Sequence, residues 1–209
     1  MRKFDLLTAV AAPYPEANVD TDRIIRIERC ARTPQGEMGR WAFEMERFAA
    51  DGTDNDAFVL NRAPFKGAAI LVTGENFGCG SSREMAVWAV AGMGIRCVIA
   101  PSFGEILFGN CFQNGLLPIR LPSEQVVRFQ QSLALATPDA PGRATLTVDL
   151  QQQLIITPWG EHVEFEVEPL RREALLEGLD PIGVTLKRVA AIDSFQARQR
   201  IARPWVWEA

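Results

Sequence analysis

The glycine-rich stretch at residues 74–84, GENFGCGSSRE, carries the residues of this chain whose types and spacing could do chemistry. Gly78 and Gly80 permit backbone conformations that are closed to other residues, so a ligand can approach the chain closely there. The first turn of a helix that follows directly would offer free N–H groups and a partial positive charge, which favour an anion. Arg83 adds a planar cation suited to contact with a carboxylate. The stretch therefore indicates a site for a small di- or tricarboxylate.

Ser81 is the candidate for proton chemistry at this site. The same donors would stabilise its alkoxide form, so that a serine could act as a base without a histidine. The chain contains only one histidine, His162, in a segment of β-rich composition. A second interpretation needs no ligand, because residues 81–84, SSRE, also fit the helix capping box S-x-x-E. The tetrapeptide alone favours the capping box by roughly two to one.

A strand, a helix and a second strand are expected to hold this stretch in place. The apolar run at 68–74 predicts a buried strand, and a helix should follow from Ser81 or Ser82 to Gly92. The next buried strand is expected at 95–100, and this order predicts a right-handed parallel crossover. Before this unit, residues 31–61 are expected to be irregular and could form a lid or a partner contact. After it, the patterns predict a helix over 103–114, a strand over 116–121 and a helix over 123–134 capped by Ser123. An antiparallel meander is expected over 144–168, followed by helices over 172–178 and 190–200 that the segment 179–187 joins.

Composition narrows the class of protein. With 209 residues, 47% of them apolar, the chain has the length of a single domain over 1–209. Its net charge is -4 and its charges are mixed along the length, which argues against nucleic acid and anionic lipid as partners. Asp5 and Pro13 interrupt the N-terminal apolar stretch, which makes a poor signal peptide. No later run reaches the roughly 18 apolar residues of a spanning helix, so a cytoplasmic protein is expected.

The four cysteines show no CxxC pairing and are expected to be reduced thiols. Cys79, Cys97 and Cys111 lack the short spacings that iron-sulfur clusters usually use. If the chemistry needs such a cluster, another polypeptide must hold it.

Several long blocks resemble one known family. GENFGCGSSRE resembles, nearly residue for residue, the core motif of the swivelling domain of the aconitase superfamily, and with Cys79 it is similar to that of isopropylmalate dehydratase small subunits. Further similar blocks are NVDTDRII at 18–25, FVLN at 58–61, VIAPSFGEILFGNCFQNGLLPI at 98–119, GLDPIGVTL at 178–186 and IDSFQ at 192–196. The resemblance implies an α/β fold, a three-layer swivelling β/β/α domain of the aconitase C-terminal type with mixed parallel and antiparallel strands.

The same resemblance implies the small subunit of a heteromeric hydro-lyase. Such enzymes isomerise 2-isopropylmalate to 3-isopropylmalate by dehydration and rehydration in leucine biosynthesis. The large subunit would hold a 4Fe-4S cluster whose open iron binds the substrate, and this chain would bind no cofactor itself.

By carry-over from the family, Ser81 would take and return the carbon-bound proton. Ser82 and Arg83 would bind a substrate carboxylate, and three residues of the N-terminal block would line or support the pocket: Asp20, Thr21 and Asp22. For Asp20 and Asp22 an Asx turn that shapes the loop is an equal alternative. Glu84 is expected to act as a cap or an ion-pair partner.

Two departures from the family pattern keep other functions open. Met85-Ala86-Val87 stands where the family has histidine followed by Ala-Pro, and residues 26–36 replace the usual Pro-Lys and aromatic-leucine stretch that is thought to touch the substrate side chain. The alternatives are a paralogue acting on another 2-alkylmalate, citramalate or homocitrate, and a non-catalytic carboxylate-binding module. A nucleotide site is disfavoured, since the loop has neither GxGxxG spacing nor a Walker lysine.

Overall fold

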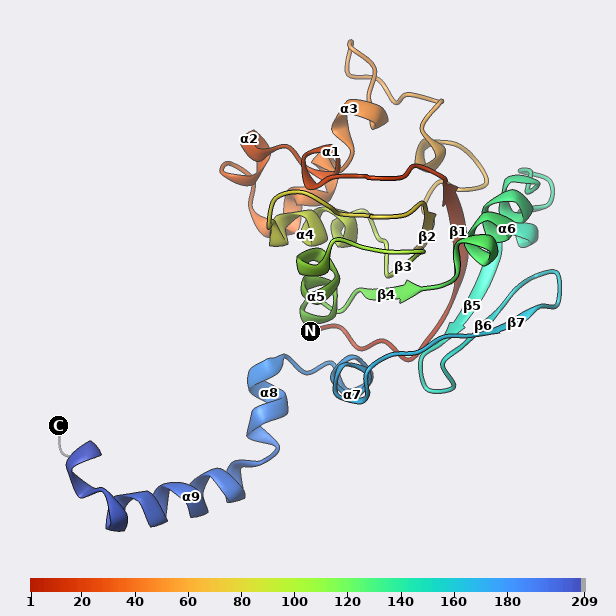
Figure 1. Cartoon of the computed structure of the whole chain (residues 1–209). Helices are drawn as coiled ribbons and strands as arrows, with labels where there is room; N and C mark the ends of the chain where they lie inside the picture. Colours follow the sequence, from red (N-terminus) through yellow and green to blue (C-terminus); the bar gives the residue numbers. More distant parts are fainter. Residues whose placement is uncertain (208–209) are drawn as a thin grey trace. The chain divides into compact units, whose positions relative to one another are not determined.

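The structure is a computed structural model and describes residues 1–207. The chain divides into two compact units, Met1–Gly178 and Leu179–Ala209, and each is described by itself. Within residues 1–178, the sheet has the strand order β4-β3-β2-β1-β5-β6-β7 (Figure 1). Its strands are β1 Leu6–Tyr14, β2 Ile70–Thr73, β3 Cys97–Ala100, β4 Leu117–Arg120, β5 Thr145–Asp149, β6 Leu154–Ile156 and β7 His162–Glu164.

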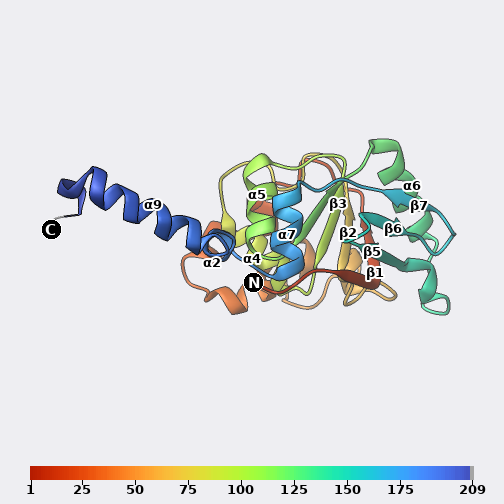
Figure 2. The ribbon, with the colours of Figure 1, turned by 90° about the horizontal axis from the view of Figure 1, so that it is seen from below.

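One half of the sheet is parallel and buried on both faces. β2 and β3 pair in parallel and are connected through helix α4, Glu84–Gly92, and β3 and β4 pair in parallel through helix α5, Glu105–Gln113. All residues of β2 and β3 are buried, as expected when helices cover both faces of a parallel sheet. Figures 1 and 2 place α4, α5 and α7, Pro169–Glu177, on one side of these strands and α6, Ser123–Ala134, on the other. The predicted order of strand, helix and strand, with the two strands paired in parallel, is confirmed.

Strand β1 joins the parallel half to the antiparallel half, and the sequence analysis did not anticipate it. It pairs in parallel with β2 and antiparallel with β5. Strands β5, β6 and β7 then continue as the antiparallel meander that was predicted. The mixed parallel and antiparallel arrangement of the predicted fold class is therefore confirmed, with β1 as the strand at which the pairing changes.

Helix α6 covers its face of the sheet with residues spaced at helical intervals. Val126, Phe129 and Leu133 are buried, as expected for the apolar stripe of an amphipathic helix. The prediction that Ser123 caps this helix is wrong. Pro122 holds the cap position, because its carbonyl accepts the first helical bonds from the amides at 125 and 126, and Ser123 is the first helical residue.

The irregular region at 31–61 contains short helical turns that pack on the site-bearing part of the fold. These are η1 Gln35–Trp41, α3 Glu44–Arg47 and η2 Val59–Asn61, and they follow two short helices, α1 Thr21–Ile24 and α2 Ile27–Cys30. The amide of Phe43 donates to the carbonyl of Ile24 at 2.8 Å, and the Arg23 side chain forms an ion pair with Glu46. The region is therefore tied to α1 by both backbone and side-chain contacts.

The second unit consists of short helices: α8 Pro181–Leu186, α9 Val189–Ala202 and η4 Pro204–Val206. The segment 179–187 was expected to be a simple connection, and this prediction is wrong because it forms α8. Asp180 caps α8 by accepting from the amide of Gly183 at 2.6 Å, and Pro181 occupies the first helical position that suits proline. Within residues 1–207 no helix is long and apolar enough to cross a membrane.

The close approach of η1 to α4 gives a prediction about stability. A Cβ added at Gly39 would lie 2.2 Å from the carbonyl carbon of Gly92, whereas one added at Gly36 would meet nothing within 4 Å. Gly39→Ala should therefore lower the free energy of unfolding by about 1–3 kcal/mol, because backbone must move to accommodate the methyl group. Gly36→Ala, the matched control, should change it by less than about 0.5 kcal/mol. Urea denaturation of the two variants measures the difference, and equal stabilities would contradict the close approach.

Candidate functional site

The candidate site lies where two segments that are distant in sequence run side by side. Residues 18–22 follow β1 and residues 75–83 follow β2, and a parallel bridge joins Asp20 to Cys79. The amide of Gly78 donates to the carbonyl of Val19 at 2.6 Å, and the amide of Thr21 donates to the carbonyl of Cys79 at 3.0 Å. The N-terminal motif and the glycine-rich stretch thus form one backbone platform.

The glycine-rich turn has the backbone conformation that was expected of it. Gly78 and Gly80 have φ values of +71° and +88°, in the left-handed region that L side chains rarely adopt. At Gly78 an added Cβ would also lie 2.3 Å from Leu107 of α5. Glycine at 78 is therefore required both for the turn and for its packing on α5.

Ser81 and Ser82 lie at the end of this turn and are both exposed. The expected start of the helix at one of these serines is wrong, because α4 begins at Glu84 with Arg83 in the cap position. No side chain caps α4, so the capping-box interpretation is wrong as well. The physical reason is that Ser81 is held back by the platform: its carbonyl accepts from the hydroxyl of Thr21 at 3.0 Å. Within residues 1–207 no side chain or backbone group is hydrogen-bonded to either serine hydroxyl.

Arg83 points back across the platform to Asp22. Its side chain is only 10% exposed, and its Nη1 and Nη2 donate to the two carboxylate oxygens of Asp22 at 2.5 and 2.8 Å. Nη1 also donates to the carbonyl of Ile25 at 3.3 Å. The other edge of the guanidinium consists of the Nε–H and the outer N–H of Nη2. It has no protein partner in the described part of the chain, and such an edge can bind a carboxylate through two hydrogen bonds.

The ion pair perturbs the titration of both partners. The hydrogen bonds from Arg83 hold the pKa of Asp22 below its usual value, and the same bonds raise the pKa of Arg83 further. The Asp22 carboxyl is 56% exposed, so solvent screens much of this interaction. The arginine therefore stays charged, and Asp22 fixes its orientation.

Asp20 and Thr21 have local structural contacts. Asp20 accepts from the amide of Arg23 at 2.7 Å and so caps α1, which agrees with the alternative of a loop-shaping aspartate. Thr21 is 2% exposed, and its hydroxyl and amide both bond to the glycine-rich stretch. The structure thus brings together all six residues expected at the site: Asp20, Thr21, Asp22, Ser81, Ser82 and Arg83.

Behind the serines, the start of α4 is fastened to α5 through Asn114. The Asn114 amide nitrogen donates to Glu84 at 2.9 Å, and its oxygen accepts from the indole N–H of Trp88 at 2.8 Å. Glu84 is therefore an acceptor within a structural network rather than a helix cap. Met85, which departs from the family pattern, packs against the apolar core.

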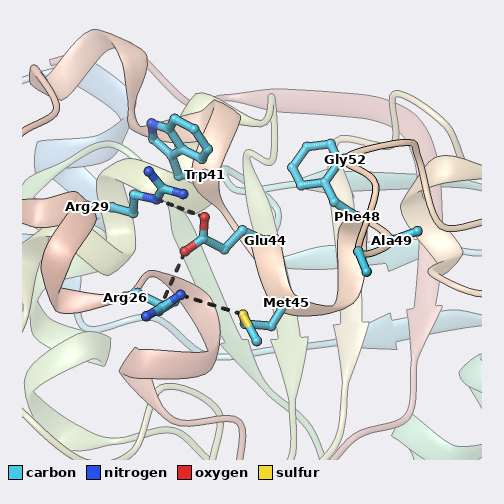
Figure 3. Close-up of a pocket in the computed structure, with 9 residues that line it drawn as sticks. Arg26, Arg29, Trp41, Glu44, Met45, Phe48, Ala49 and Gly52 are labelled. Carbon is cyan, nitrogen blue, oxygen red and sulfur yellow. Dashed lines mark hydrogen bonds and ion pairs between the residues drawn. The ribbon is translucent and has the colours of Figure 1, made fainter.

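Sequence reasoning missed a pocket that begins at Arg26 (Figure 3). The preceding residue, Ile25, is the one whose carbonyl accepts a hydrogen bond from Arg83. It has a volume of about 600 Å³. The charge of Arg26, on its wall, helps to lower the pKa of Asp22. The pocket is lined by Arg26, Arg29, Trp41, Glu44, Met45, Phe48, Ala49, Ala50 and Gly52.

Inside this pocket one buried carboxylate lies between two guanidinium groups. Glu44, whose side chain is 9% exposed, is 2.8 Å from Nε of Arg29 and 3.7 Å from Nε of Arg26. Arg29 also stacks on Trp41, 3.6 Å from the ring centre. Figure 3 shows Met45 and Phe48 on the apolar wall beside this cluster. Two features of the sequence pointed to this region: the departure of residues 26–36 from the family pattern, and the irregular stretch at 31–61.

The described residues provide no obvious ligand set for a metal cluster. Among residues 1–207 there is no group of three or more His, Cys, Asp or Glu side chains that could hold a metal ion. All four cysteines are free thiols, and burial raises the pKa of Cys97 and Cys111 well above the usual range, which opposes the thiolate form that a metal needs. A cluster does not fit this part of the chain.

Comparison with known proteins gives consistent results along the whole length. The pattern of the Aconitase C-terminal domain family matches residues 1–124, and a pattern described as LeuD_N matches 134–169. A third pattern, for the C-terminal domain of the 3-isopropylmalate dehydratase small subunit, matches 182–206. The first match confirms the fold type that the resemblance implied.

Individual relatives cover nearly all of both chains. The 3-isopropylmalate dehydratase small subunit of Gluconacetobacter diazotrophicus is 51% identical over 205 residues, which cover 98% of this chain and 97% of the relative. That of Dinoroseobacter shibae is 48% identical and covers 99% and 100%. A crystal structure of 3-isopropylmalate dehydratase from Methanocaldococcus jannaschii is similar with a TM-score of 0.62 at 28% identity, covering 91% of this chain and 99% of that one.

The Asp22–Arg83 pair predicts a pH response of known sign. Because the folded-state pKa of Asp22 is depressed, its contribution to stability is present above the unfolded pKa of about 3.9 and is lost as the pH falls through the folded value. In an NMR titration the Asp22 carboxyl should titrate below about 3.9, and Arg83→Gln should raise its pKa towards that value. Asp51, whose pKa is lowered by hydrogen bonds from Thr53, is the internal control and should titrate identically in both proteins. An unshifted Asp22 in the variant would exclude the ion pair in solution.

Proposed function

The chain belongs to the 3-isopropylmalate dehydratase small-subunit family, and on this premise we propose that it supplies the serine and the arginine of an active site completed by a large subunit. The observation that carries the proposal is the pairing of an exposed, unbonded serine hydroxyl at 81 with the anchored guanidinium of Arg83 on one backbone platform. The reaction is the isomerisation of 2-isopropylmalate to 3-isopropylmalate by removal and return of water.

Ser81 is the proposed base of this reaction. In the dehydration its alkoxide takes the proton of one substrate carbon and becomes a hydroxyl, while the C–O bond of the neighbouring carbon breaks and the hydroxide would be taken up on the large-subunit side of the site. In the rehydration a hydroxide adds to the carbon that lost the proton, and Ser81 returns a proton to the other carbon. The uncapped start of α4 and the guanidinium of Arg83 both favour a negative charge in this region. The Thr21 hydroxyl holds the Ser81 carbonyl and so limits the movement of the base.

Arg83 is the proposed carboxylate-binding residue. Asp22 occupies the end of the guanidinium and leaves the Nε edge for the substrate, so the ion pair orients the arginine instead of blocking it. Ser82, exposed beside it, is proposed to donate to the same carboxylate. Asp20, Thr21 and Asp22 then support the pocket from the opposite segment.

The pocket around Glu44 is the proposed location of the substrate's variable group. Its wall of Met45 and Phe48 suits a branched aliphatic chain, and Arg26 and Arg29 are both already engaged with Glu44. A branched apolar group could be bound beside this wall without breaking these ion pairs. The opposite side of the pocket is polar, because the indole N–H of Trp41 and Oε1 of Glu44 have no hydrogen-bond partner within residues 1–207. The apolar wall favours an isopropyl group over the small methyl group of citramalate.

The proposed partner is the large subunit of the same dehydratase, and we place the 4Fe-4S cluster that this family chemistry implies on that subunit. The cysteines of the present chain are free thiols, which agrees with a reducing compartment, and we propose a cytoplasmic location. The test is to copurify the two chains and to assay the pair with 2-isopropylmalate, citramalate and homocitrate. Turnover of 2-isopropylmalate supports the proposal, whereas binding without turnover of any of the three favours the non-catalytic module.

Ser81→Ala should abolish most of the activity of the assembled enzyme. Loss of a general base typically lowers the rate by about 10²- to 10⁴-fold, and kcat should fall by that amount with little change in subunit association. Ser123→Ala is the matched control, because it removes a hydroxyl from α6 on the other side of the sheet. Near-normal kcat in Ser81→Ala would refute the assignment of the base.

Arg83→Lys should act mainly on substrate binding. A lysine cannot keep two bonds to Asp22 and also present a second flat edge to a carboxylate, so KM should rise by roughly 10- to 100-fold. Arg128→Lys is the control, since it alters the 3.0 Å ion pair between Arg128 and Glu161, and Arg128 belongs to α6, on the other side of the sheet from α4. Steady-state kinetics of the assembled pair provide both constants, and a wild-type KM in Arg83→Lys would exclude the carboxylate role.

A further inference from the structure

Within the second unit, the apolar side chains of α8 and α9 are not buried against one another. Neither α8 nor α9 contains a buried residue, and Ile182, Phe195 and Ile201 are 68%, 53% and 86% exposed. The exposed large apolar residues of this unit are Ile182, Leu186, Val189, Phe195, Ile201, Trp205, Val206 and Trp207. Monomeric proteins rarely expose so many large apolar side chains within one short segment.

These side chains are spaced as in a helix that docks on another protein. Ile182 and Leu186 are four residues apart in α8, and Val189, Ile192 and Phe195 follow one another at intervals of three in α9. Residues three or four apart lie on one side of a helix, so each helix presents an apolar stripe. Amphipathic helices that bind a hydrophobic groove use anchors at the same intervals.

The segment is also too short to be stable without a partner surface. α8 and α9 contain 6 and 14 residues, and isolated helices below about 12–15 residues are marginal in water. Its exposed aromatic and aliphatic side chains together offer several hundred Å² of apolar surface. A stable protein interface needs about 800 Å² from each partner, which is of the same order.

We propose that residues 179–207 are the segment by which this chain docks on its large subunit, and this rests on the proposed function. The Aconitase C-terminal domain pattern ends at residue 124. Beyond it lie the LeuD_N pattern at 134–169 and, within this segment, the pattern for the C-terminal domain of the 3-isopropylmalate dehydratase small subunit at 182–206. A subunit that is not covalently joined to the rest of its enzyme must supply a binding surface, and this pattern marks the chain segment found in such subunits.

Charge indicates the chemistry of the surface that receives this segment. Residues 179–207 contain five lysine or arginine residues and two aspartates, although the whole chain has a net charge of -4. The segment is therefore cationic on an otherwise acidic protein. The complementary groove on the large subunit should be apolar at its centre and acidic at its rim, since such complementarity steers association.

The test compares charge insertions on two sides of the segment. In the first variant Ile182→Asp and Phe195→Asp are combined, and each places a carboxylate on an apolar stripe. The matched control combines Ala190→Asp and Ala197→Asp, which adds the same two carboxylates on the side of α9 opposite Val189, Ile192 and Phe195, where both alanines are exposed. The dissociation constant of each full-length variant for the purified large subunit is measured by biolayer interferometry. We expect at least a tenfold increase for the Ile182→Asp/Phe195→Asp double variant and less than a twofold change for the Ala190→Asp/Ala197→Asp control.

Activity measurements distinguish a failure of the docking proposal from a failure of the proposed dehydratase function. Because the double variant leaves Ser81 and Arg83 intact, an excess of it over the large subunit should restore the wild-type kcat. An active wild-type pair in which the double variant binds normally would overturn the docking proposal and leave the dehydratase function standing. A wild-type pair that binds but turns over no alkylmalate would instead defeat the function, while the dissociation constants would still decide the docking.

The isolated chain tests the two other possible occupants. Sedimentation velocity and thermal melting of the wild type and the double variant should be the same if the segment is reserved for the large subunit. A change in self-association would assign the segment to a second copy of the chain. A lower melting temperature with an unchanged affinity for the large subunit would assign it to the chain's own first unit, and either result would overturn the proposal.

Discussion

The backbone pairing of residues 18–21 with residues 75–81 is the constraint on which the candidate site depends. Each segment leaves the carboxyl end of a neighbouring parallel strand, so the sheet delivers both to the same edge. The pairing uses mainly backbone amides and carbonyls, and two side-chain bonds add to it: Thr21 to the carbonyl of Ser81, and Asn76 to Asn18. Because the contacts are mostly backbone, the positions of Ser81 and Arg83 are set by strand register and by the left-handed glycine at 78 more than by any single side chain.

The ion pair between Asp22 and Arg83 follows from the cost of a buried cation. An arginine that is 10% exposed needs a counterion, because an unpaired charge in this position would be strongly destabilising. Asp22 supplies it from an exposed position, so little desolvation of the carboxylate is needed. The arginine is thereby held in a fixed orientation before any ligand arrives, which reduces the entropy that binding has to remove.

The sequence predicted the parts of the fold whose patterns are local. Short apolar runs at β2 and β3 and the glycine-rich turn between β2 and α4 have few interpretations, and the six site residues lie together as the motifs implied. Strand β1 was missed because its pattern changes halfway, from alternating exposure over residues 6–9 to continuous burial over 11–14. The start of α4 was misplaced because a capping box looks the same in sequence whether or not Ser81 is held elsewhere by Thr21. The pocket around Glu44 could not be foreseen, since it is assembled from residues 26–29 and 41–52 only after the intervening turns have folded.

The exposure of the catalytic candidates explains why such a site would need a second chain. Ser81 and Ser82 lie at the surface, where water screens charge and an interaction of about 4 kcal/mol at an effective dielectric of 20 falls to about 1 kcal/mol. A serine alkoxide and a bound dicarboxylate would both be weakly stabilised under those conditions. Covering this surface with another polypeptide would exclude water and strengthen the contribution of Arg83 and of the α4 amides together. Under the proposed function, the fold would therefore supply a preorganised half of a site, whose electrostatic advantage would appear only when the partner closes over it.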